Sequence, residues 1–491
     1  MAAGHPAVVD AAAAMLRAGG NAYDAVVAAG FAGTVAEPGF TSLGGGGYVL
    51  ARTAAGDEIL FDFFVDTPGR GKARRGAAPL LRAGGGAVPG RDPGVPLRPR
   101  LGGRAGRAGR PAARAAPPGP ALPARGRRPG RDPGWRRRPL APKQATVLAL
   151  LEPILRRTPD VEAIFAPDGR LAGAGDRLRN PDLARFLDRL GIDPGNGFYR
   201  GRVATQLARA MADGAGLVTA EDLASYRVIE RDPLAFEYRG RRVLTNPPPS
   251  FGGRLIAIAL DLLQEAGPLP RPGSADHAHA LARAMIEVDR RRSEERDPST
   301  TPTSVRGTTH VSVADVEGNV AAMTTSNGEC SGDVIAGTGV LLNNMLGEED
   351  LHPGGFHAGP PGVRVASMMA PTIVVAPGGD VELVLGSGGS KRIRTAVLQV
   401  LTLVVDGGVP VDAAVDAPRL HWDTDHLEVE PGLSAGVVDH LRTLGPVNTW
   451  PERNLFFGGV HAVAPGRGAA GDPRRDGASG RIPGPAAERD A

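Results

Sequence analysis

The sequence of 491 residues lacks several features that would narrow its function. Its single cysteine, Cys330, excludes an internal disulfide and a zinc site built from several cysteines. No run of apolar residues approaches the roughly 18 that a membrane-spanning helix needs, so we expect no membrane span. Residues 1–6 show no charged segment leading into an apolar one, as a signal peptide would. We therefore expect a cytoplasmic protein.

The positive charge is concentrated in one stretch of the chain. The formal net charge is +4, but residues 72–143 alone hold 19 Lys or Arg against two Asp, and the remaining chain has a net charge of −13. From 73 to 142 only Ala, Arg, Gly, Pro, Leu, Val, Asp and Trp occur. Such a composition cannot bury enough apolar surface to offset the entropy of ordering, so it predicts disorder.

Three interpretations of residues 72–143 remain open. An Arg/Gly-rich RNA-binding tract would need aromatic side chains to stack on bases, and only Trp135 is present. A solvated linker is a second interpretation. The third is that the codons are read out of frame, because all eight residue types can be written with GC-rich codons. Since the acidic remainder of the chain gives no case for nucleic acid, we expect no nucleic-acid partner.

Helical and extended segments alternate along the rest of the chain. An Ala-rich helix over 6–16 ends at Gly19-Gly20, and Asn21 can cap a second helix over 22–32. Periodicity predicts further helices over 182–190, 223–226, 254–265, 275–290 and 392–403, and strands over 48–50, 59–64, 310–313, 320–323, 373–375 and 382–385. The last four strands form two antiparallel hairpins. This order predicts an α+β layered fold.

The sharpest local feature is Gly307-Thr308-Thr309-His310, at the start of a predicted hairpin strand. Threonine is a weak nucleophile unless a base lies beside it, and cutting the chain before it frees its own α-amine for that task. A glycine on the other side of the bond would allow the strained backbone of an N→O acyl shift. On its own, the motif also fits β-branched residues entering a strand.

A second feature is Gly386-Ser387-Gly388-Gly389-Ser390, between a predicted strand and a predicted helix. Successive glycines at such a turn expose backbone N–H groups that can hold an oxyanion or a phosphate, although an ordinary turn has the same sequence. The turn lacks the Gly-Lys-Ser/Thr ending of a P-loop, and Gly44–Gly47 lacks G-x-G-x-x-G. The histidines show no metal-ligand spacing, so we expect no metal and no cofactor.

Six segments together resemble a known family: Gly19–Ala25 followed by the glycine run 44–47, Asn246–Gly253, Thr308–His310 with Asp315 and Gly318-Asn319, Leu342–Asn344, Ser367–Thr372 and Gly386–Ser390. In this order they are similar to motifs of the γ-glutamyltransferase (glutathione hydrolase) family of N-terminal-nucleophile hydrolases, in a divergent bacterial branch. The resemblance covers the chain except 72–143 and the far C-terminus.

The resemblance implies a four-layer αββα sandwich made as a precursor that cuts itself between Gly307 and Thr308. Residues 1–307 would form a large chain and 308–491 a small chain, each the partner of the other. Thr308 would supply the hydroxyl nucleophile and the α-amine base. Gly388 and Gly389 match the N–H pair that holds the oxyanion. Ser326 stands where the family has a threonine bonded to the nucleophile.

The resemblance also assigns substrate contacts. Ser367 matches a serine that contacts the substrate carboxylate, while Glu348 and Asn327 (or Gly328, depending on a gap of one residue) match contacts to the glutamyl α-amine. Phe64 departs from the pattern, because it replaces an arginine that clamps the α-carboxylate.

We therefore expect a self-processing threonine amidohydrolase that cleaves γ-glutamyl amides such as glutathione and passes the acyl group to water or an amino acid. Met345 stands at the position of a polar substrate contact. Phe64 and Met345 leave open an acylase of another side-chain amide. The atypical 72–143 leaves open a catalytically impaired member of the family.

Overall fold

The computed structural model describes residues 1–71, 139–190, 196–214, 216–294, 307–348, 351 and 359–482. The stretch predicted to be disordered therefore lies outside the described residues except for its end, 139–143, where helix α3 (Pro142–Leu150) begins. In the described part of the chain, no helix is long and apolar enough to cross a membrane.

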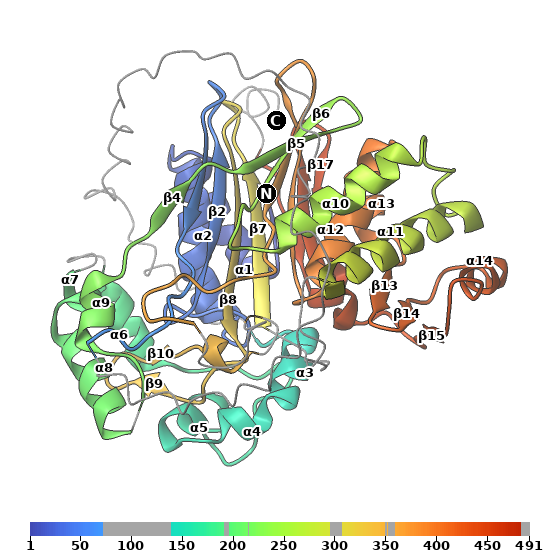
Figure 1. The fold of residues 1–491 in the computed structure, drawn as a ribbon. Helices are drawn as coiled ribbons and strands as arrows, with labels where there is room; N and C mark the ends of the chain where they lie inside the picture. The colour runs from blue at the N-terminus through green and yellow to red at the C-terminus, as the bar shows by residue number, and fades with distance from the viewer. Residues whose placement is uncertain are drawn as a thin grey trace, which may run out of the picture.

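Two β-sheets form the centre of the structure (Figure 1). The first has seven strands in the order β18 (Ala478–Ser479), β1 (Ala2–Ala3), β7 (Gly307–Ala314), β8 (Val320–Gly328), β2 (Gly46–Arg52), β3 (Glu58–Asp62) and β4 (Ile229–Arg231). The second has six, in the order β17 (Gly468–Ala470), β16 (Gly459–Ala464), β12 (Val381–Gly388), β11 (Thr372–Val375), β6 (Arg241–Thr245) and β5 (Leu234–Tyr238). All strand pairs in both sheets are antiparallel.

The two sheets face each other, and helices cover their outer faces. Strands β7 and β8 pack against β12, and β7 also packs against β16. Helices α1 (Pro6–Arg17) and α2 (Ala22–Ala36) cover the first sheet, and α10 (Gly252–Glu265), α11 (Ala275–Glu294), α12 (Arg392–Val405) and α13 (Val411–Asp416) lie on the side of the second (Figure 1). The fold is therefore an α+β layered fold, as the pattern of elements predicts, and the αββα sandwich that the family resemblance implies.

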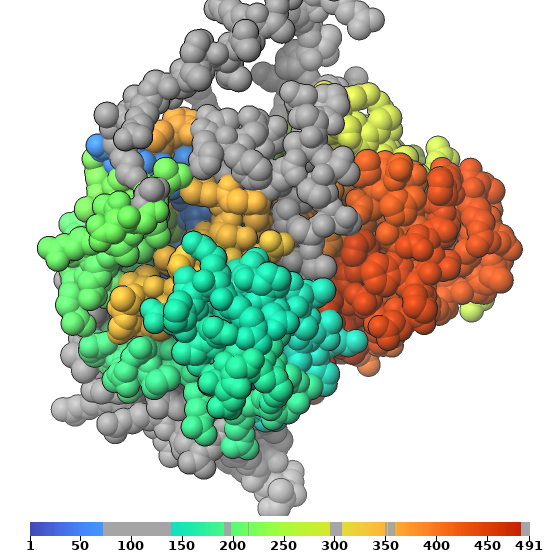
Figure 2. Space-filling view, turned by 90° about the horizontal axis from the view of Figure 1, so that it is seen from below, coloured from blue at the N-terminus to red at the C-terminus, as the bar shows by residue number. Residues whose placement is uncertain are grey.

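Smaller elements surround the sandwich. Helices α3, α4 (Glu152–Leu155) and α5 (Pro159–Phe165), drawn in teal, cover the lower end of the molecule (Figure 2). Beside them lie α6 (Pro181–Leu190), α7 (Asn196–Tyr199), α8 (Arg202–Asp213), α9 (Ala220–Ser225), β9 (Val334–Ile335) and β10 (Val340–Leu341). The C-terminal part adds a small sheet of β13 (Leu420–Asp423), β14 (His426–Val429) and β15 (Val447–Thr449), with α14 (Ala435–Leu441).

The predicted helices and hairpins are confirmed in type, and the differences lie at their ends. Asn21 caps α2 as predicted, accepting hydrogen bonds from the N–H groups of Tyr23 and Asp24, but the helix continues to Ala36. The strand predicted over 59–64 ends at Asp62, because the Asp62 carboxylate accepts a hydrogen bond from the Phe64 N–H and turns the chain.

A buried ion cluster fixes the last part of the described chain. Asp472 is fully buried and receives ion pairs from Arg419 at 2.7 Å and Arg474 at 3.2 Å. Arg474 also pairs with Glu430. The Asp472 carboxylate accepts a hydrogen bond from the Val460 N–H in β16 at 2.8 Å. The cluster thereby holds the short helix η5 (Pro473–Arg475) against the second sheet.

We predict that Asp472→Asn lowers the free energy of unfolding at pH 7 by about 3–5 kcal/mol, because two buried guanidinium groups lose their shared counter-charge. Burial alone would raise the pKa of Asp472, but Arg419 and Arg474 lower it to about 2. The stabilisation is present above the unfolded-state pKa and is lost as the pH falls toward 2. Urea unfolding at pH 7 and pH 3 measures both effects, and the difference between variant and parent should shrink at pH 3.

A matched control for this measurement is Asp439→Asn, which removes an exposed carboxylate paired with Arg442 on α14. We expect it to change the free energy of unfolding by less than about 1 kcal/mol. Both changes are best made in Thr308→Ala, which we expect to remain a single chain. An equal effect of the two substitutions would contradict the role given to Asp472.

Candidate active site

Thr308 lies near the start of β7, in the middle of the first sheet. It pairs with Ser326 of β8, and the register shifts between Gly307 and Thr308. The Thr308 hydroxyl donates a hydrogen bond to the Ser326 hydroxyl at 3.2 Å, and Ser326 donates in turn to the carbonyl oxygen of Gly307. In the uncut chain, hydroxyl groups thus connect the predicted nucleophile to the carbonyl of the bond that it would cut.

Gly307 is a position where a side chain has no room. A Cβ atom there would lie 2.3 Å from the carbonyl oxygen of Gly39 and 2.6 Å from that of Gly328. Two other backbone segments therefore press against the residue before Thr308. This close approach gives a physical reason for the glycine that the sequence places at the predicted cleavage point.

The turn Gly388-Gly389 lies directly against the nucleophile. A Cβ atom on Gly388, the last residue of β12, would lie 2.0 Å from the carbonyl oxygen of Thr308. Gly389 has a φ of +121°, which L side chains rarely adopt. The turn leads into α12, whose N-terminus favours negative charge. This placement fits the predicted oxyanion site, and the role of the two N–H groups stays a prediction.

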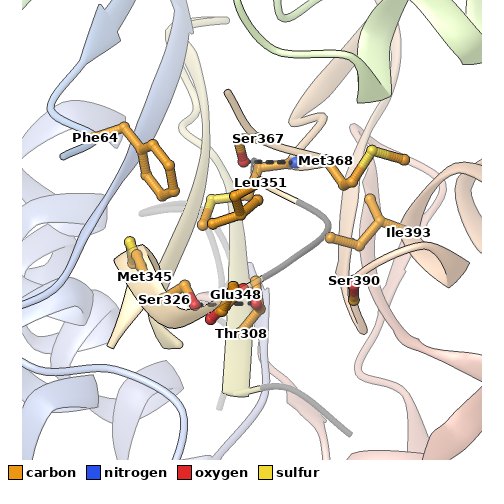
Figure 3. A pocket seen from close by; sticks show the side chains of 11 residues that line it. Phe64, Thr308, Ser326, Met345, Glu348, Leu351, Ser367, Met368, Ser390 and Ile393 are labelled. Carbon is orange, nitrogen blue, oxygen red and sulfur yellow. Dashed lines mark hydrogen bonds between the residues drawn. The ribbon is translucent and has the colours of Figure 1, made fainter. Parts of the chain in front are cut away.

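A pocket opens above Thr308 (Figure 3). Phe64 and Met345 lie on one side, Met368 and Ile393 on the other, and Thr308 with Ser326 at the base. The other lining residues are Glu348, Leu351, Ser367, Met369 and Ser390. The pocket therefore combines the hydroxyl pair with a mainly apolar wall and one carboxylate.

Phe64 occupies the wall of the pocket and is 1% exposed. Its ring stacks on Tyr48, with ring centroids 5.6 Å apart. The guanidinium of Arg364 lies behind this wall, where it donates to the Phe64 carbonyl oxygen and pairs with Asp66 at 3.1 Å. Arg364 is not a lining residue of the pocket. It therefore does not replace the arginine that the family has at the position of Phe64.

The structure brings most of the predicted binding residues to the pocket. Glu348 and Ser367 line it, and so does Met345. Asn327 does not, since its side chain donates to the carbonyl oxygen of Leu342 at 3.4 Å. Its neighbour Ser326 faces the pocket instead, as alternation along a strand predicts. Substrate contacts of Asn327, Glu348 and Ser367 stay predictions.

His310, the last residue of the Thr-Thr-His motif, has a structural role. Its ring is fully buried between the sheets, where Nδ1 is 2.8 Å from the Thr324 hydroxyl and Nε2 is 2.9 Å from the Ser312 hydroxyl. Burial lowers the pKa of His310 well below its usual range, so the ring stays neutral. A Cβ atom on Gly386 would lie 2.3 Å from the ring. Histidine here fills the space between sheets.

Several residues of the site were not predicted. Met368 and Met369 belong to a segment singled out for its motif and Ile393 to a predicted helix, but only the fold turns these side chains into the pocket. Arg475 donates to the carbonyl oxygen of Thr308 at 2.9 Å from 167 residues away, and no sequence signal marks that contact. Among the described residues, no group of His, Cys, Asp or Glu is arranged to hold a metal ion.

A family model described as Gamma-glutamyltranspeptidase matches residues 9–79, 138–305 and 283–482. This chain belongs to that family. The matched segments leave out 80–137, which lies inside the Arg/Gly/Pro-rich stretch. The family is one of N-terminal-nucleophile amidohydrolases.

Relatives in this family carry two kinds of name. The chain is 31% identical to the glutathione hydrolase proenzyme of Escherichia coli (strain K12), over 88% of this chain and 82% of that protein. It is 30% identical to the Acylase ACY 1 proenzyme of Pseudomonas sp. (strain SE83), over 94% and 88%. A crystal structure of cephalosporin acylase from Bacillus halodurans shares the fold, with a TM-score of 0.73 and 22% identity over 98% and 95%.

We predict that Ser326→Ala slows self-cleavage by about 100-fold, because the Gly307 carbonyl loses a hydrogen bond where negative charge would develop. Ser326→Thr, which keeps the hydroxyl, should cleave at nearly the parent rate. A time course on denaturing gels after a pulse of synthesis measures the rate. Cleavage of Ser326→Ala at the parent rate would show that the Ser326 hydroxyl takes no part in self-cleavage.

Proposed function

We propose that this protein is a self-processing threonine amidohydrolase whose preferred acyl group carries no carboxylate. The lining of the pocket carries the proposal for the acyl group: most of the side chains are apolar, and among the described residues no Lys or Arg reaches it. The hydroxyl chain from Thr308 through Ser326 to Gly307 supports the self-processing step.

Self-cleavage begins with attack of the Thr308 hydroxyl oxygen on the carbonyl carbon of Gly307. The C–N bond between the two residues breaks, an ester to the Thr308 oxygen forms, and the nitrogen of Thr308 leaves as an amine. Ser326 stabilises the negative charge on the Gly307 oxygen during the attack. Water then hydrolyses the ester, which leaves a carboxylate on Gly307 and a free α-amine on Thr308.

The two chains stay together after cleavage because they share both sheets. Strand β7 pairs with β1, and β8 pairs with β2, so strands from both sides of the cut are hydrogen-bonded to each other at two places in the first sheet. In the second sheet, β11 pairs with β6. Separating the chains would break backbone hydrogen bonds in both sheets and expose the core between them.

Catalysis then uses the same hydroxyl on an external amide. The α-amine of Thr308 accepts the hydroxyl proton as the oxygen attacks the amide carbon, and passes it to the leaving amine. The N–H groups of Gly388 and Gly389 hold the oxyanion. The acyl group remains as an ester on Thr308 until water, or an amine such as an amino acid, accepts it.

The wall of the pocket sets the preference for the acyl group. A carboxylate bound against Phe64 and Met345 would lose water without gaining a cation, which is costly in a buried site. Glu348 is 6% exposed and would repel it further. The same carboxylate of Glu348 attracts an amino group. The pocket therefore favours an acyl chain without a carboxylate, with or without an amine.

A second candidate is a γ-glutamyl amide such as glutathione. Glu348 favours it, because the carboxylate is placed in the pocket where it can bind the α-amine of a glutamyl group. The relatives named glutathione hydrolase proenzyme also support this candidate. It requires the α-carboxylate to bind without the arginine that Phe64 replaces.

We predict the order of four anilides that differ only in the acyl group: butanoyl, 4-aminobutanoyl, glutaryl and γ-glutamyl. Butanoyl has neither an amine nor a carboxylate, 4-aminobutanoyl has only the amine, glutaryl has only the carboxylate, and γ-glutamyl has both. The two anilides without a carboxylate should show kcat/KM at least about 10-fold higher than the two with one, since an unpaired buried charge costs more than 1.4 kcal/mol. If γ-glutamyl anilide is the best of the four, the second candidate replaces the first.

The variant Phe64→Arg sharpens this test. It should raise kcat/KM for the glutaryl and γ-glutamyl anilides, because a guanidinium pairs with their carboxylate. It should lower kcat/KM for the butanoyl anilide, because this acyl group leaves the buried guanidinium without a partner. Phe64→Leu is the control for loss of the ring, and it should leave the order of the four unchanged. Denaturing gels of each variant check that self-cleavage is complete before rates are compared.

A further inference from the structure

Arg475 is a buried cation to which the proposed reaction gives no role. It is 4% exposed and ends η5. Its Nη1 donates to the carbonyl oxygen of Thr308 at 2.9 Å. Its guanidinium also lies over the ring of Phe40, 5.0 Å from the centroid. The side chain therefore reaches the backbone of the nucleophile itself, with an aromatic ring against the guanidinium.

Glycines keep a space open for this guanidinium. A Cβ atom on Gly459 would lie 2.1 Å from Cδ of Arg475, and one on Gly388 would lie 3.1 Å from Nη1. A Cβ atom on Gly389 would lie 3.5 Å from Nη2. Two of these glycines form the turn that touches Thr308. The arginine thus contacts both the nucleophile and the turn, and fixes one against the other.

Arg475 remains charged at neutral pH. Burial, together with nearby Arg392, lowers the pKa of Arg475 to about 10. The charged groups that surround it come from separate elements: Glu37 after α2, Arg392 at the start of α12, Arg419 before β13 and Asp472 before η5. Glu348 lines the same pocket as Thr308, and His310 on β7 is neutral.

Glu37 supplies the opposite charge on the other side of β7. It is 2% exposed, and its Oε1 accepts a hydrogen bond from the Thr309 hydroxyl at 3.0 Å. Burial raises the pKa of Glu37 to about 7. Since alternate side chains of a strand point to opposite faces, Glu37 and the Thr308 hydroxyl lie on different sides of the strand. The carboxylate is therefore the weaker influence on Thr308.

We propose that Arg475 is a positioning residue for the nucleophile, which holds the Thr308 backbone against the Gly388-Gly389 turn and keeps the new α-amine uncharged. A cation bound to the carbonyl oxygen of the same residue disfavours the ammonium form of its α-amine. An amine that is uncharged at neutral pH can accept the hydroxyl proton. The inference rests on the proposed function, in which cleavage frees that amine.

The pKa of the Thr308 α-amine tests this inference without any substrate. Competitive labelling with acetic anhydride over a range of pH, read by mass spectrometry on the first peptide of the small chain, measures it. Arg475→Met should raise this pKa by roughly 1, because the neighbouring cation is lost. Arg475→Lys, which keeps the charge, should stay close to the parent value. Glu37→Gln should shift the pKa in the opposite direction, downward.

The control is Arg394→Met, which removes a buried arginine that pairs with Asp289 at 2.8 Å on the outer side of α12. This substitution should leave the pKa of the Thr308 α-amine unchanged. An unchanged pKa in Arg475→Met overturns the inference while the proposed function stands. If Arg475→Met fails to fold or cleave, Arg475→Gln is measured in its place: a raised pKa supports the inference, and an unchanged one overturns it. A parent protein that stays uncut refutes the proposed function instead.

Discussion

The site depends on how closely three pieces of backbone approach Gly307 and Thr308. Gly39 and Gly328 lie against Gly307, and Gly388 lies against the carbonyl oxygen of Thr308, so close that no Cβ atom would fit between them. The contact between Gly388 and Thr308 sets the spacing of the two sheets at the nucleophile. It also puts the Gly388-Gly389 turn, which precedes α12, beside Thr308, whose hydroxyl oxygen would attack the substrate. The same close packing of the two sheets therefore sets the geometry proposed for the reaction.

Buried charge holds the parts of the chain that complete this arrangement. Arg419, Arg474 and Asp472 fix η5 against the second sheet, and η5 carries Arg475 to Thr308. Since a buried charge is costly without partners, such a cluster has few alternative arrangements. Arg475, near the end of the described chain, is thereby tied to Thr308, 167 residues earlier. The placement of residues 472–475 and the placement of the Thr308 backbone therefore depend on each other.

Local chemistry could be predicted from the sequence, and the pocket could not. The motifs at Thr308 and at Gly388-Gly389 lie together as predicted, because a turn or a strand start is specified by adjacent residues, and the roles of these residues stay predictions. Met368 and Ile393 needed the fold, since strand and helix direction decide which face of each segment meets the pocket. Asn327 shows the same limit, because its side chain bonds to the carbonyl oxygen of Leu342 instead of lining the pocket.

The account rests on Thr308 being freed by the chain itself. Intact-mass analysis of the purified protein, with fragmentation of the smaller species, tests this most directly. The account predicts two chains in equal amounts, the smaller beginning at Thr308, and one uncut chain for Thr308→Ala. A parent protein that remains a single chain, or that is cut at another bond, would contradict it.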